Sequence, residues 1–120
     1  MREAMKKPIA ISSGAPFQIQ VFFEKPWELK ADAKENILTL FVEEQGQLTK
    51  LQEWSASDIA KNKTLVTRTK FSADKKYHLQ GILDACSSNT CVPYEADLNL
   101  QAVTDSKAPG QITLPYIPNL

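Results

Sequence analysis

FQIQVFF, at residues 17–23, places Phe17, Ile19, Val21 and Phe23 in alternation with Gln18, Gln20 and Phe22. Successive side chains of a β-strand point to opposite faces of a sheet, so this alternation is typical of a strand with one buried face. Pro26 follows within a few residues and cannot donate a backbone hydrogen bond, which ends the run. The stretch therefore predicts a half-buried strand.

Further segments with strand composition follow it, separated by turn-forming residues. Residues 37–42 (ILTLFV) are apolar on both faces, which is typical of a central strand. Residues 43–47 (EEQGQ) then predict a polar hairpin turn, and the chain returns as a strand over residues 48–54. Only residues 55–61 have helical character. The remaining strands are expected at 65–71, 77–83, 98–102 and, as an edge strand because of its prolines, 112–117.

About six to eight short strands with almost no helix predict an all-β fold, specifically an immunoglobulin-like antiparallel β-sandwich. The chain of 120 residues has the size of one domain, with 42% hydrophobic and 23% charged residues. We expect residues 1–14 to form a flexible lead-in and residues 15–120 to form a single β-sandwich domain.

The charge balance bears on partners and location. The 14 Lys and Arg residues equal the 14 Asp and Glu residues, which argues against a nucleic-acid partner. No run approaches the roughly 20 apolar residues of a membrane helix, and residues 9–11 are too short for the apolar part of a secretory signal. We therefore expect no membrane insertion by this segment. Two nearby cysteines favour an oxidising compartment, with the cytoplasm as the alternative.

The concentrated chemistry of the chain is the sequence CSSNTC at residues 86–91. Ser, Asn and Thr form turns, and the flanking residues have strand composition, so a hairpin with Cys86 and Cys91 facing each other is the expected geometry. Opposed positions on antiparallel strands lie about 4.5–5.5 Å apart at Cα, which a disulfide tolerates. Cys86 and Cys91 are therefore the candidate catalytic residues.

The role of this pair stays open among several interpretations. The loop is so short that a bond across it contributes only about 2 kcal/mol in the chain-entropy model, which favours a redox-active pair over a structural bridge. A structural bridge, two free thiols or half of a metal site are the alternatives. A structural zinc site needs four N or S ligands, whereas the chain has two cysteines and one histidine, His78. We expect neither a metal nor a cofactor.

Other kinds of site have weaker support in the sequence. A Cys–His hydrolase would need His78 to be oriented by a third group, and the four glycines are isolated rather than gathered in a phosphate-binding loop. The aromatic residues near Trp27 and Phe41 offer a small-ligand module as a third interpretation. Packing in the core or at a sheet edge accounts for such aromatic residues more often.

Residues 77–86 (YHLQGILDAC) and 91–94 (CVPY) together resemble the N-terminal domain of the DsbD family of thiol:disulfide interchange proteins. The resemblance implies an immunoglobulin-like fold in the periplasm, with Cys86 and Cys91 as the reactive pair and Pro93 as the proline that follows it. The spacer between the cysteines is about one residue shorter than in that family, and Tyr94 replaces a usual second proline. The aromatic cap loop of the family has no clear counterpart.

A second resemblance covers more of the chain. Residues 25–33 (KPWELKADA), the Cys-x4-Cys segment and residues 98–105 (LNLQAVTD) are similar to the C-terminal β-domain of thioredoxin-like NHL-repeat proteins. Together the resemblances imply a thiol-disulfide exchange module that passes electrons to or from a protein partner with a thioredoxin-like domain, as part of a protein-disulfide reductase system. The alternative is a non-catalytic interaction or support domain of a larger thioredoxin/NHL-type protein, with a structural disulfide.

Overall fold

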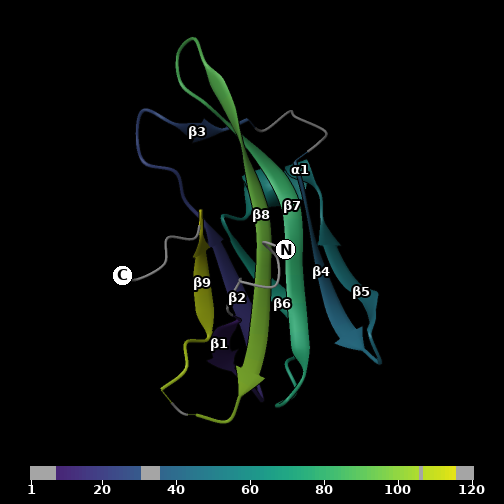
Figure 1. The fold of residues 1–120 in the computed structure, drawn as a ribbon. Coiled ribbons are helices and arrows are strands. Elements are labelled where there is room, and N and C mark those ends of the chain that lie inside the picture. The colour runs from purple at the N-terminus through teal and green to yellow at the C-terminus, as the bar shows by residue number, and fades with distance from the viewer. Residues whose placement is uncertain (1–7, 31–35, 106, 116–120) are drawn as a thin grey trace.

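The computed structural model describes residues 8–30, 36–105 and 107–115, whose strands form two sheets packed face to face (Figure 1). The larger sheet has the order β1-β8-β7-β4-β5, with β3 added beside β7, and the smaller has the order β6-β2-β9. The strands are β1 (Ile9–Ser12), β2 (Pro16–Val21), β3 (Glu28–Leu29), β4 (Ile37–Glu44), β5 (Gln47–Trp54), β6 (Thr64–Lys70), β7 (Lys76–Cys86), β8 (Cys91–Val103) and β9 (Gln111–Leu114).

This architecture confirms the predicted all-β, immunoglobulin-like sandwich. The order β8-β7-β4-β5 follows the G-F-C-C′ order of a variable-type immunoglobulin sheet. Two details differ from the prediction. The described residues hold nine strands, because β1 and the two-residue β3 also pair, and the sheets are mixed, since β1 runs parallel to β8 and β9 runs parallel to β2.

Residues 9–12, which fall within the predicted lead-in, belong to a strand. These residues form β1, which pairs with β8 from Ile9↔Leu100 to Ser12↔Val103, and the side chain of Ile11 is fully buried. A short apolar run is enough here because an existing strand edge supplies the backbone partners. The sandwich therefore includes residues before position 15, whereas residues 1–7 lie outside the described part of the chain.

The predicted alternation is confirmed for residues 17–21, whereas β2 ends at Val21 and the half-buried Phe23 lies beyond it. Phe17, Ile19 and Val21 are buried, and they face the core between the two sheets. Phe17 stacks on Phe71 with ring centroids 5.3 Å apart, and Phe71 stacks on Tyr77 at 4.0 Å. Fully burying an aromatic side chain of this size contributes roughly 1.5–3 kcal/mol, so this stack is one of the main contacts that join the two sheets.

The predicted helical segment is a short helix, α1 (Ala56–Lys61), between β5 and β6. Ser55 caps it: its hydroxyl accepts from the Asp58 N–H, and the Asp58 carboxylate accepts from the Ser55 N–H at 3.1 Å. That backbone hydrogen bond, followed by the bond from the Ser55 hydroxyl, lowers the pKa of Asp58 below its usual value. Ile59 is buried and attaches the helix to the core.

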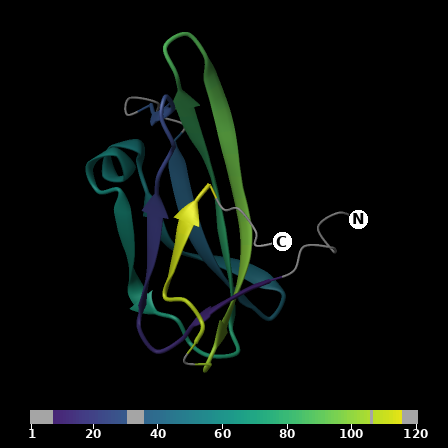
Figure 2. The same ribbon diagram turned by 90° about the vertical axis from the view of Figure 1, so that its left-hand side faces the viewer.

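The β7–β8 hairpin reaches one end of the sandwich. Its connecting loop lies beyond the end of β9, while the loop from β8 to β9 lies at the opposite end (Figures 1 and 2). At this end β4 no longer accompanies β7, because the last β4–β7 pair is Ile37↔Ile82, and β3 takes its place. The end of the hairpin carries both cysteines.

Candidate functional site

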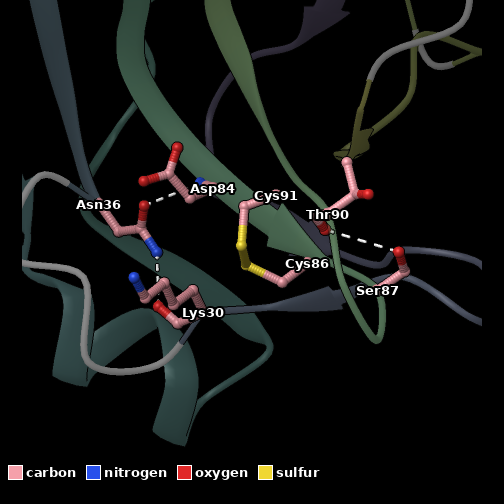
Figure 3. The surroundings of a disulfide bond; sticks show 7 residues. All are labelled: Lys30, Asn36, Asp84, Cys86, Ser87, Thr90 and Cys91. Carbon is pink, nitrogen blue, oxygen red and sulfur yellow. Dashed lines mark hydrogen bonds between the residues drawn. A yellow bond between two sulfur atoms is a disulfide. The ribbon is translucent and has the colours of Figure 1, made fainter.

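Cys86 and Cys91 form a disulfide bond across the end of the β7–β8 hairpin (Figure 3). Cys86 is the last residue of β7 and Cys91 the first of β8, and the two are direct register partners with Cα atoms 4.0 Å apart. The hairpin and the pairing predicted from residues 86–91 are therefore confirmed. The catalytic role assigned to the two residues stays a prediction.

The backbone explains why these two positions come together. The Ser87 N–H donates a hydrogen bond to the Thr90 carbonyl at 2.8 Å, so Ser87 and Thr90 form a hydrogen-bonded pair. Pairs alternate along an antiparallel ladder, which makes Cys86 and Cys91 a non-hydrogen-bonded pair. Side chains approach most closely at such pairs, and the loop Ser87–Thr90 needs no further contact to hold the sulfur atoms in reach.

The disulfide lies on the outer face of the larger sheet. Leu83 and Ala85 of β7 are buried toward the core, so Cys86, which follows in the alternation, points to the other face. Cys86 is half-buried and Cys91 is exposed. The pair is therefore not enclosed in the core, and Cys91 is the more accessible of the two residues.

β3 explains the partial burial of Cys86. Glu28 pairs with Cys86 and Leu29 with Ala85, on the edge of β7 opposite to β8. The next residue, Lys30, continues the ladder because its N–H donates to the Asp84 carbonyl at 2.8 Å. Cys86 is therefore flanked by a strand on both sides.

Asn36 fixes this junction and was missed by the sequence reasoning. It is fully buried; its Nδ2 donates to the Lys30 carbonyl at 2.8 Å, and its Oδ1 accepts from the Asp84 N–H at 2.8 Å (Figure 3). One amide side chain thus joins β3 to β7 just where β4 leaves. A polar residue directly before the apolar run 37–42 was the available signal, although its partners could not be read from the sequence.

The charged residues on this face are mostly acidic. Glu28 lies beside Cys86 in register, Asp84 is two positions earlier on β7, and Glu95 is four positions after Cys91 on β8. Among the described residues, the cation placed beside them by the β3–β7 ladder is Lys30. Negative charge near a sulfur atom disfavours the thiolate that reduction produces. The surroundings of the pair therefore favour the disulfide over the thiolate form.

Of the other candidate residues, His78 and Phe41 lie away from the cysteines. His78 contacts Glu43, with Nε2 and Oε1 3.0 Å apart, and it precedes Cys86 by eight residues on the same strand, a separation of roughly 26 Å. Phe41 pairs with His78, whereas Trp27 directly precedes β3 at the cysteine end, so these two aromatic residues do not share a site. Across residues 8–30, 36–105 and 107–115, no three His, Cys, Asp or Glu side chains gather in a way that would hold a metal ion.

No protein-family model, curated protein or solved structure matches this chain. The resemblances to the DsbD N-terminal domain and to the NHL-type β-domain therefore remain predictions. In the part of the chain that the structure describes, no helix has the length and apolar character needed to cross a membrane.

Proposed function

We propose that this domain is a thiol-disulfide exchange module in which the Cys86–Cys91 bond accepts electrons from, or returns them to, a protein dithiol. The observation that supports the proposal is the position of the bond on the outer face of a terminal hairpin, with Cys91 exposed. Accessible disulfides are the labile ones, whereas bridges inside a core are shielded from exchange. The bridge also closes a loop too short to contribute much stability.

The reaction balances with a partner dithiol as the reductant. A partner thiolate forms a bond with Cys91 Sγ, the Cys86–Cys91 bond breaks, and Cys86 leaves as a thiolate that takes up a proton. The second partner thiol loses its proton and attacks the partner sulfur of the mixed disulfide, which releases Cys91. Two electrons and two protons have then moved from the partner to this domain. Cys91 is the expected target because β3 flanks Cys86.

The partner class follows from this chemistry. A protein with two neighbouring thiols, such as a thioredoxin-like domain, supplies both the attacking and the resolving sulfur. A disulfide of this kind persists in an oxidising compartment, which supports a location in the periplasm or the cell envelope. The same reaction run backwards would oxidise a partner.

The decisive experiment is a redox titration of the folded protein against a thioredoxin or a dithiothreitol couple of known potential. We expect reversible reduction of Cys86–Cys91, without unfolding, at a potential above about −300 mV, because structural bridges lie below that value. The Cys86→Ala variant serves as the control, because it keeps one thiol and cannot form the intramolecular disulfide that is titrated. A potential far below that range, or reduction only after denaturation, would rule out electron transfer.

The second candidate is a non-catalytic interaction or support domain with a structural disulfide. The acidic neighbours of the bond favour it, since they oppose thiolate formation. This candidate predicts that the double variant Cys86→Ala/Cys91→Ala keeps partner binding in full. Loss of partner turnover in that variant, with its circular dichroism spectrum unchanged, would favour the exchange module instead.

A further inference from the structure

We infer that the outward edge of β8 beside Cys91 is a strand-addition site, at which an extended segment of the attacking partner protein pairs with residues 91–95. The inference rests on the proposed exchange function and adds the direction and the backbone contacts of the approach. The juxtaposition of the exposed residue Cys91 and a strand edge beside which the described residues place no further strand carries it.

β8 has thirteen residues, and β7 pairs with it from Gln101 to Cys91. On its other edge, β1 pairs only with residues 100–103. Among the described residues, no strand lies against that edge at positions 91–95. Exposed Cys91, Pro93 and Glu95 lie along this part of β8.

The ladder determines which backbone groups face outward. The bond from Ser87 to Thr90 directs the backbone of Thr90 toward β7, and the alternation then directs Val92 toward β7 and Cys91 and Glu95 away from it. Pro93, which has no N–H, also occupies an outward position, so its presence removes no hydrogen bond between β7 and β8. The N–H and C=O groups of Cys91 and Glu95 are therefore oriented toward an added strand.

The chemistry of exchange requires an approach from the same side. In thiol-disulfide exchange the attacking sulfur lies nearly in line with the bond that breaks, on the far side from the leaving sulfur. The disulfide runs from Cys86 on β7 to Cys91 on β8 (Figure 3), so an attack on Cys91 that expels Cys86 comes from beyond the β8 edge. An attack on Cys86 would have to come from the side that β3 occupies.

Charge and side-chain chemistry define the occupant. Strand edges that must avoid self-association carry proline or charge, and here Pro93 and Glu95 fill that role. Proline and charge oppose pairing with another copy, but a partner that is already held by a mixed disulfide can still pair with the outward N–H and C=O groups of Cys91 and Glu95. Glu95 and Glu28 make this region acidic, so the fitting segment is an extended stretch with a neutral or basic charge beside a reactive thiol.

The first test compares Glu95→Pro with Glu95→Gln. The proline removes the outward N–H without taking a hydrogen bond from β7, and the glutamine removes the same charge while it keeps the N–H. The readout is the rate constant for reduction by reduced thioredoxin divided by that for reduction by dithiothreitol, which needs no strand contact. We expect this ratio to fall roughly three- to tenfold in Glu95→Pro relative to Glu95→Gln, the value of one backbone hydrogen bond. Equal ratios would overturn the inference.

The second test does not depend on the proline variant folding. Residue-resolved amide exchange is measured on the mixed disulfide that the Cys86→Ala variant forms through Cys91 with a thioredoxin whose resolving cysteine is replaced by serine, since neither protein then holds a thiol that could break the bond. The Cys91 and Glu95 amides should be slow in this complex and fast in a Cys91–glutathione mixed disulfide, while Val92 stays slow in both. Equal exchange in the two species overturns the inference. Slow exchange in the free protein also overturns it, because the edge is then filled by this chain or, if it depends on concentration, by a second copy.

The two proposals fail in different ways. If reduced thioredoxin leaves the wild-type disulfide intact while dithiothreitol reduces it, protein exchange through this edge is excluded. If neither reagent reduces the folded protein, the exchange function itself fails. If thioredoxin reduces wild type and both Glu95 variants with the same rate ratio, the exchange function stands and only strand addition is rejected.

Discussion

Two hairpins of the larger sheet are closed in different ways. The β4–β5 hairpin ends in a two-residue turn, in which Gln45 and Gly46 have φ angles of 53° and 78°. Positive φ at both central positions is the type I′ geometry, which matches the twist of the flanking strands. The β7–β8 hairpin instead ends in the four-residue loop Ser87–Thr90, with a disulfide at its last register pair.

The difference shows that this sheet does not need a covalent bond to close a hairpin. The β4–β5 turn is closed by backbone conformation alone, and its end carries no cysteine. The disulfide occurs in the hairpin that extends to the end of the sandwich (Figure 2), and Cys91 is exposed there. Variants in each hairpin test whether the bond has a role beyond closing its hairpin.

The largest effect is expected at Gly81, where the two hairpins meet. A Cβ there would overlap the Ile37 carbonyl oxygen and lie 2.9 Å from the Leu38 Cα, both backbone atoms of β4. Gly81→Ala should therefore force β4 and β7 apart and lower the free energy of unfolding by about 3 kcal/mol. Urea denaturation measures this loss. Gly110→Ala is the matched control, since its added methyl group meets only the Ser12 hydroxyl. Similar losses of stability in both variants would show that β4 and β7 are not tightly packed at Gly81.

An intermediate effect is expected from removal of the disulfide. Cys86→Ala/Cys91→Ala should lower the free energy of unfolding by about 2 kcal/mol, because the bond constrains a six-residue loop in the unfolded chain. Reduced wild-type protein should lose the same amount if the covalent bond, rather than side-chain packing, is responsible. Denaturant unfolding with and without a reductant provides the comparison. A much larger loss would indicate that the bond supports the fold beyond the hairpin end.

The fold was largely predictable because its strands alternate. The pattern of Phe17, Ile19 and Val21 identified β2, and the apolar residues of β4 identified a central strand. β1 was missed because residues 9–12 form a strand only by pairing in parallel with β8, which is distant in sequence. Local patterns carry no information about such a partner.

The candidate site was predictable only in part. The spacing of Cys86 and Cys91 indicated a hairpin and a disulfide because turn geometry is local. The surroundings that distinguish the two cysteines come from Glu28, which pairs with Cys86, and from Asn36, which bonds to Asp84, and both lie about fifty or more residues earlier in the chain. Which cysteine is more accessible therefore became clear only when β3 was placed beside β7.

The smallest effect is expected in the turn of the β4–β5 hairpin. Gly46 has a φ of 78°, and a Cβ there would contact nothing within 4 Å, so a substitution acts through backbone conformation rather than packing. Gly46→Ala should lower the free energy of unfolding by about 1 kcal/mol, since an L-residue is disfavoured in the left-handed region. Thermal unfolding followed by circular dichroism measures the change.

A matched variant in the same turn should act in the opposite direction. Gln45 also has a positive φ, of 53°, and Asn adopts this conformation more readily than Gln, so Gln45→Asn creates the favoured Asn-Gly pair and should raise stability. Neither variant should alter the reduction rate of Cys86–Cys91, because the turn lies at the other end of the sheet from the cysteines. A changed reduction rate would mean that the two hairpins are coupled. The conformation of the β4–β5 turn and the reactivity of the disulfide would then not be independent.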